Sequence, residues 1–116
     1  MNFQIQDSEI DGDTQVIALG GEVDLYTAPE FKERLLEIIE SGKKRVVVDL
    51  SKATFIDSTT LGVLVGGVKR LRPAGGTLLI VCSDPNITKI FEITGLDRVF
   101  QIHPSRDEAL AAAAEA

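Results

Sequence analysis

Residues 46–50 read Val-Val-Val-Asp-Leu, a short and nearly continuous apolar run. Such a run is typical of a strand that is covered on both faces, as strands inside a parallel sheet are. A second apolar run at residues 77–82 (Thr-Leu-Leu-Ile-Val-Cys) follows the turn signal Gly75-Gly76. Between the two runs, apolar residues recur at helical spacing over residues 61–71. Strand, helix and strand in this order predict a parallel βαβ unit with a right-handed crossover.

The chain before this unit predicts a β-hairpin. Residues 3–6 alternate between apolar and polar side chains, and residues 15–19 (Gln-Val-Ile-Ala-Leu) form a second short strand. The Asp-Gly-Asp sequence at residues 11–13 supplies the turn between them. The glycines at the start of residues 20–26 predict that a loop follows the hairpin, and a polar loop is also expected after Leu50.

The remaining elements are helices and one strand with recognisable end signals. They are a helix from Thr27 to Gly42, a helix from Asp84 to Gly95, a strand at residues 99–102, and a helix from Ser105 that frays into an alanine-rich tail at residues 111–116. Thr27 with Glu30, and Ser105 with Glu108, have the spacing of a capping box. The order ββαβαβαβα predicts one α/β domain over residues 1–116, with a mixed central sheet of about five strands and about four helices.

Composition narrows the classes of function. The 116 residues are 44% hydrophobic and 26% charged, which is the mix of a globular domain. The single cysteine, Cys82, excludes an intramolecular disulfide, and no apolar run approaches the roughly 18 residues of a membrane helix. Twelve Lys and Arg against eighteen Asp and Glu give a net charge of −6, which argues against nucleic acid and anionic lipid as partners. Without the pattern of a signal peptide at its start, the chain is expected to be cytoplasmic.

Catalytic and metal-binding motifs are missing from the sequence. His103 precedes Pro104 and is expected in a turn, and Cys82 ends an apolar strand and is expected in the core. The spacings of zinc sites and of a Walker loop do not occur, and Ser58 lacks the flanking glycines of a nucleophile elbow. We therefore expect no self-contained catalysis, no metal and no cofactor, while nucleotide binding by other means stays open.

Asp49 is the first position at which chemistry could occur. It ends a buried apolar strand, where ligands gather in open α/β sheets. It could be the phosphoacceptor of a receiver-like protein, or serve a small hydrolase. A receiver, however, has a pair of acidic residues after its first strand, and here the strand at residues 15–19 runs into Gly20-Gly21. The alternative is a carboxylate that bonds to nearby loop amides.

The second such position is the stretch Asp57-Ser58-Thr59-Thr60 at a helix start. Either Asp57 or Ser58 can serve as the N-cap, but a cap needs only one such residue and four are present. A helix N-terminus also tolerates a phosphate, because its free N–H groups and dipole favour negative charge. The glycines at 62, 66 and 67 each disfavour the helix by about 1 kcal/mol relative to alanine. They are explained either by close packing on the sheet or by a bare face for a partner.

Several stretches together resemble the bacterial anti-sigma factor antagonists, the founding group of STAS domains. They are residues 20–24 (Gly-Gly-Glu-Val-Asp), 46–50, 55–62 (Phe-Ile-Asp-Ser-Thr-Thr-Leu-Gly), 90–96 and 99–100. The resemblance covers essentially the whole chain, and its most specific part is the Asp57-Ser58 pair. One departure is Thr60, which stands where many members carry glycine.

The resemblance implies a regulatory cycle called partner switching. The unmodified antagonist binds an anti-sigma factor that is also a serine/threonine kinase, and the sigma factor is released. The kinase phosphorylates the serine that matches Ser58, binding is lost, and a PP2C-type phosphatase restores it. The partner-binding residues expected from this resemblance and from the predicted loops are Glu22, Asp24, Asp57, Ser58, Thr59, Thr60 and Gly62.

Two alternatives remain beside this hypothesis of a non-enzymatic switch. In one, the chain is a STAS module for another partner, such as a transport complex, and Ser58 is only a cap. In the other, it is a small hydrolase or a receiver-like phosphoprotein that uses Asp49. For Asp24 alone, the alternative to partner contact is that it bonds only within its own loop.

Overall fold

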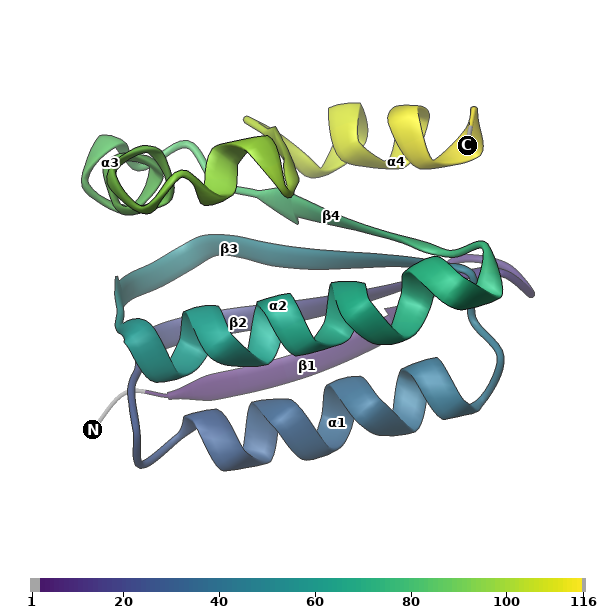
Figure 1. The fold of residues 1–116 in the computed structure, drawn as a ribbon, viewed down its shortest axis with the longest axis horizontal. Coiled ribbons are helices and arrows are strands. Elements are labelled where there is room, and N and C mark those ends of the chain that lie inside the picture. Colours follow the sequence, from purple (N-terminus) through teal and green to yellow (C-terminus); the bar gives the residue numbers. More distant parts are fainter. Residues whose placement is uncertain (1–2, 116) are drawn as a thin grey trace.

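The computed structural model describes residues 3–115 and contains one mixed sheet in the strand order β1-β2-β3-β4-β5 (Figure 1). β1 (Gln4–Glu9) pairs antiparallel with β2 (Thr14–Val23). The other strands, β3 (Arg45–Ile56), β4 (Thr77–Val81) and β5 (Gln101–His103), extend the sheet in parallel. The predicted α/β class and the predicted order of elements are confirmed.

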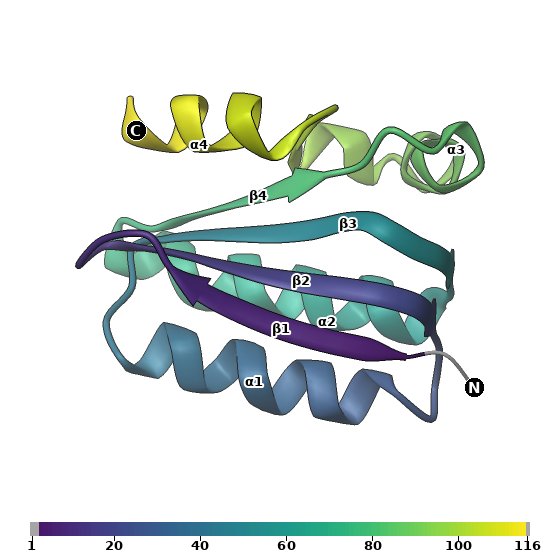
Figure 2. The same cartoon turned by 180° about the vertical axis from the view of Figure 1, so that it is seen from behind.

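Helices cover both faces of the sheet. α1 (Ala28–Glu40), α2 (Ser58–Leu71) and α3 (Pro85–Thr94) share the larger core, and α4 (Arg106–Ala114) packs on the smaller one. In β3, Val46 and Val48 belong to the larger core, while Val47 between them belongs to the smaller core. Because successive strand residues point to opposite faces, β3 is covered on both sides, as its sequence predicts. α2 lies in front of the sheet in Figure 1 and behind it in Figure 2.

Most predicted helix ends are confirmed by local geometry. Gly42 and Gly95 have φ angles of 99° and 76°, which glycine adopts without strain after a helix. The Asp84 carboxylate accepts the N–H of Asn86, and the Ser105 hydroxyl accepts the N–H of Glu108. Two short 3-10 helices, Arg72–Ala74 and Leu96–Arg98, follow α2 and α3.

Two strands are longer than predicted. β2 continues through Gly20-Gly21 to Val23, where a loop was expected, and β3 continues past Leu50 to Ile56. The extensions pair with each other, with register shifts near Gly20 and Gly21, and Gly21 has a φ of 79°. The glycines therefore accommodate an irregular strand pairing instead of ending the strand.

The alanine-rich tail is also more ordered than predicted. α4 extends to Ala114, and Ala113 is buried against the sheet together with Ala109. The small side chains allow the helix to approach the valines of β2, β3 and β4 closely.

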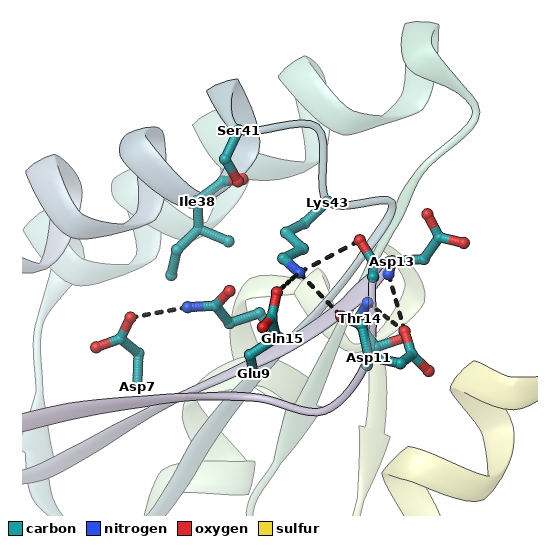
Figure 3. Close-up of polar contacts among 10 residues, drawn as sticks. Asp7, Glu9, Asp11, Asp13, Thr14, Gln15, Ile38, Ser41 and Lys43 are labelled. Carbon is teal, nitrogen blue, oxygen red and sulfur yellow. Dashed lines mark hydrogen bonds and ion pairs between the residues drawn. The ribbon is translucent and has the colours of Figure 1, made fainter.

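At the end of the sheet where β2 begins, Lys43 ties the hairpin to the loop before β3 (Figure 3). Its ammonium group donates to the Glu9 carboxylate and to the backbone carbonyls of Asp11 and Gly12. The Asp11 carboxylate accepts the N–H groups of Asp13 and Thr14, and the first of these bonds holds the pKa of Asp11 below its ordinary value. This end of the molecule is fixed by internal bonds, since Lys43 itself is buried.

Candidate functional site

The loops after β2 and β3 lie at the same end of the sheet. Val23 and Ile56 are paired in the parallel ladder, so the residues that follow them, Asp24 and Asp57, come from neighbouring strand ends. The two loops therefore lie together. At the left of Figure 1, the loop that enters α1 and the first turn of α2 lie at this end.

The N-cap of α2 is Asp57. Its backbone is extended, and its carboxylate accepts the N–H of Thr60 at 3.1 Å. Ser58, the first residue of the helix, is exposed, and its hydroxyl has no hydrogen-bond partner among residues 3–115. Of the two capping residues that the sequence allows, the structure therefore selects Asp57 and leaves the Ser58 hydroxyl accessible.

Thr60 links the first turn of α2 to the end of β2 through a buried hydrogen bond. Its side chain is completely buried, and its hydroxyl donates to the carbonyl oxygen of Val23 at 2.7 Å. Thr60 was predicted to bind a partner, but its buried side chain is not accessible to one. Its structural contribution is to fix the start of α2 against the end of β2.

The β2–α1 loop is held by its own side chains. The Asp24 carboxylate accepts the N–H groups of Tyr26 and Thr27, at 2.9 and 3.2 Å. The Thr27 hydroxyl accepts the N–H of Asp24 and donates to the carbonyl of Glu22. The capping box predicted for Thr27 and Glu30 is absent, because Thr27 has helical backbone angles and its hydroxyl is engaged within the loop.

These bonds favour the structural interpretation of Asp24, because both of its described partners belong to its own loop. Glu22, by contrast, is exposed on the last part of β2. Glu22 therefore places an exposed negative charge at this end of the sheet, where another molecule could contact it.

Three large apolar side chains are exposed near the same strand ends. Leu25 and Tyr26 lie in the β2–α1 loop and are 58% and 76% exposed, and Phe55, 48% exposed, pairs in register with Glu22. These three residues were not among the predicted partner-binding residues, although the pair Leu25-Tyr26 was visible in the loop predicted at residues 20–26. Exposed aromatic and aliphatic side chains beside an accessible serine form a surface suited to protein contact.

Asp49 is engaged in bonds that tie α4 to the sheet. It lies within β3, not at the strand end, because β3 continues to Ile56. Its carboxylate accepts the N–H and hydroxyl of Ser51, at 2.9 and 2.5 Å, and pairs with Arg106 at 2.9 Å. Burial opposes ionisation, but the Ser51 and Arg106 contacts outweigh it and lower the pKa of Asp49. The carboxylate serves the structure, which removes the basis for a receiver-like or hydrolytic reaction.

The remaining candidates for chemistry are Cys82 and His103. Cys82 is buried in the larger core, and desolvation raises the pKa of its thiol. His103 is the last residue of β5 and half-buried. Within residues 3–115, no group of three or more His, Cys, Asp or Glu side chains is arranged to hold a metal ion. In the same range, no helix has the length and hydropathy that a membrane span requires.

Comparisons with known proteins agree with this architecture. A curated "Anti-sigma-B factor antagonist" from Listeria monocytogenes is 39% identical over 103 residues, which cover 88% of this chain and 90% of the relative. The crystal structure of an anti-sigma factor antagonist from Mycobacterium paratuberculosis superposes with a TM-score of 0.88 at 26% identity, covering 97% of this chain and 94% of that one.

The fold is also that of the Bacillus cell fate determinant SpoIIAA in its phosphorylated form. That structure has a TM-score of 0.74 at 22% identity and covers 96% of this chain and 98% of that one. Residues 5–109 match the family described as the STAS domain. With this match over most of its length, the chain belongs to the STAS domain family.

Proposed function

We propose that this chain is an anti-sigma factor antagonist whose binding is switched by phosphorylation of Ser58. In the unphosphorylated state it binds an anti-sigma factor, and the sigma factor is thereby released to direct transcription. The observation that carries the proposal is the free Ser58 hydroxyl on the first turn of α2, at the end of the sheet where the loop with the exposed Leu25 and Tyr26 also lies. Since Asp57 provides the cap, Ser58 is available for modification without loss of a structural bond.

The physical effect of a phosphate at Ser58 is a change in charge at a docking surface. A phosphoserine carries close to two negative charges at neutral pH, and Glu22 and Asp57 already place carboxylates around this end of the sheet. The helix N-terminus tolerates the phosphate, because its N–H groups and dipole favour an anion. The domain therefore keeps its fold, while a partner seated over Ser58 meets added charge and bulk.

The partner and the modifying enzymes follow from the family resemblance. The anti-sigma factor is proposed to be a serine/threonine kinase that transfers the γ-phosphoryl group of ATP to Ser58. The Ser58 Oγ–phosphorus bond forms, the bond to the leaving ADP oxygen breaks, and the serine proton passes to a base on the kinase. A PP2C-type phosphatase hydrolyses the phosphoserine and restores binding. The chain itself supplies no catalytic group to this cycle, which we place in the cytoplasm.

The acceptor is tested by incubating the purified chain with the host's anti-sigma kinase and ATP. Mass spectrometry is expected to find one phosphate at Ser58, and none on Ser58→Ala. Thr59→Ala tests the neighbouring hydroxyl, which is also exposed on the first turn, and any phosphate it gains is still expected at Ser58. A phosphate on Thr59 in the wild type would contradict the assignment.

The effect on binding is tested by calorimetry with the same anti-sigma factor. Ser58→Asp is expected to weaken binding at least tenfold, or about 1.4 kcal/mol, since aspartate carries part of the phosphate charge. Ser58→Ala is expected to bind like the wild type and to change the free energy of unfolding by less than about 0.5 kcal/mol. Equal affinities for all three proteins would place Ser58 outside the interface and overturn the proposal.

A further inference from the structure

A groove runs between α1 and α2 and begins at the first turn of α2. It has a volume of about 360 Å³. Its lining residues are Lys32, Leu35, Leu36, Thr59, Gly62, Val63, Gly66, Gly67 and Arg70. No acidic residue is among them, although the chain contains eighteen Asp and Glu residues. The groove thus combines a floor of small and aliphatic residues with a positive charge contributed by each helix.

Two cations line the groove, Lys32 from α1 and Arg70 from α2. Arg70 and Lys32 are exposed, and neither forms an ion pair or a side-chain hydrogen bond with any of residues 3–115. In a chain with a net charge of −6, two unpaired cations with no neighbouring carboxylate in the lining make this groove locally positive. Acidic groups on another molecule would therefore be attracted to it.

Packing explains only one of the three glycines in the groove. A Cβ atom on Gly67 would lie 3.0 Å from Leu35 Cδ2 and 3.1 Å from Leu78 Cδ1, so close packing of α2 on the core requires a glycine there. A Cβ atom on Gly62 or Gly66 would meet nothing within 4 Å. Glycine disfavours a helix relative to alanine, so these two positions lower the stability of α2 without any internal benefit. A second molecule that approaches the helix backbone closely would explain them.

We propose that the groove between α1 and α2 receives an acidic amphipathic helix of the anti-sigma factor. The apolar face of that helix would lie on Val63, Leu36 and the bare glycines, and its Asp or Glu residues would pair with Lys32 and Arg70. From Thr59 to Arg70, α2 advances about 16 Å, which accommodates roughly three turns of a bound helix. The inference rests on the proposed function, because Thr59 belongs both to the groove and to the turn that carries Ser58.

The test uses charge reversal with a matched control on the neighbouring residue. Arg70→Glu removes a cation that lines the groove, whereas Lys69→Glu makes the same charge change at an exposed position of α2 outside the lining. By calorimetry with the purified anti-sigma factor, Arg70→Glu is expected to weaken binding at least tenfold and Lys69→Glu less than threefold. Gly66→Leu, which fills the groove from a position with free space, is expected to weaken binding at least tenfold while circular dichroism shows a folded domain.

A compensating change in the partner identifies the occupant. Individual Glu→Lys and Asp→Lys variants of the anti-sigma factor are expected to include one that restores binding to Arg70→Glu and weakens binding to the wild type. That residue is expected on an amphipathic helix. Rescue by a residue outside any helix, or by none, would overturn the proposal.

These measurements distinguish failure of the proposed function from failure of the inference about the groove. If the wild type does not bind the anti-sigma factor, or Ser58→Asp binds like the wild type, the proposed function is wrong. If Ser58→Asp weakens binding but Arg70→Glu and Lys69→Glu bind alike, the interface does not include the groove and only the present inference is wrong. A dimer in sedimentation that Arg70→Glu dissociates, with anti-sigma binding unchanged, would instead assign the groove to a second copy of this chain.

Discussion

Alanine at Gly66 should stabilise the domain, and alanine at Gly67 should destabilise it, although the two positions are adjacent. Gly66 lies inside α2 without a positive φ, and a Cβ atom there would meet nothing within 4 Å. Gly66→Ala therefore gains only the helix preference of alanine, which is about 1 kcal/mol. For a domain of this size, that gain corresponds to a rise of about 4 °C in the melting temperature.

Gly67→Ala gains the same helix preference, but the added Cβ atom also lowers the stability by overpacking the core. Its Cβ atom would approach Leu35 and Leu78 to 3.0 and 3.1 Å, and both leucines are buried, so neither can move aside freely. Overpacking a core in this way costs about 1–3 kcal/mol, which leaves a net loss of up to about 2 kcal/mol after the helix gain.

Urea unfolding of the wild type and the two alanine variants, followed by circular dichroism at 222 nm, measures both effects. A third variant, Gly62→Ala, serves as a second open position, because a Cβ atom there also meets nothing within 4 Å. The reasoning fails if Gly66→Ala lowers the free energy of unfolding, or if Gly67→Ala raises it as much as Gly66→Ala does.

Two further predictions concern bonds that hold the site and the last helix. Thr60→Val removes the hydroxyl that donates to Val23 while keeping the shape of the side chain, and should lower the free energy of unfolding by about 1–2 kcal/mol. Thr60→Ser, which restores the hydroxyl, should recover most of that loss in the same urea titration. Arg106→Gln should cost about 1 kcal/mol at pH 7, since Arg106 is partly exposed. Because the folded-state pKa of Asp49 is lowered, the contribution of this pair is complete above about pH 4 and falls as the pH drops through the folded value. The stability difference between wild type and Arg106→Gln should thus shrink at pH 3, and a constant difference would contradict the role given to Asp49.

The order and type of the elements could be predicted because their signals are local. The apolar run at residues 46–50 specifies a doubly covered strand by itself, and Gly42 and Gly95 end helices through backbone angles that only their own residue needs to adopt. Asp84 and Ser105 cap their helices through neighbours two and three residues away. Each of these features depends on a few consecutive residues, so the sequence alone contains the information.

Two predictions about local structure are wrong because a competing interaction outweighs the local sequence pattern. Gly20 and Gly21 read as a loop, but pairing with Lys52 and Ala53 of β3 keeps them in a strand. Thr27 has the right spacing for a capping box, but its hydroxyl donates instead to the carbonyl of Glu22 near the end of β2. In the first case a tertiary contact selects the conformation that the pattern does not favour, and in the second a competing local hydrogen bond does.

In the candidate site, too, local features could be predicted from the sequence and features set by tertiary packing could not. Asp57 and Ser58 could be found from residue type and spacing, because a cap and an accessible hydroxyl at a helix start are local features. Which of the two residues caps the helix and which stays accessible could not be predicted, since both are chemically able to cap. The burial of Thr60 and the exposure of Tyr26 depend on how the two loops meet. The groove that Lys32 and Arg70 line requires α1 and α2 to lie side by side, which spacing along the chain does not reveal.

The separation of structural and accessible groups would allow this end of the sheet to act as the switch proposed above. If Ser58 were the cap, a phosphate would remove a bond that α2 needs, and binding and folding would change together. Here Asp57 holds the helix start, Thr60 holds it to β2, and Asp24 holds the neighbouring loop. None of these bonds involves the Ser58 hydroxyl, so its modification can alter the charge of the surface while the fold beneath is kept. Affinity can then change by orders of magnitude while the bonds that hold the domain together are kept.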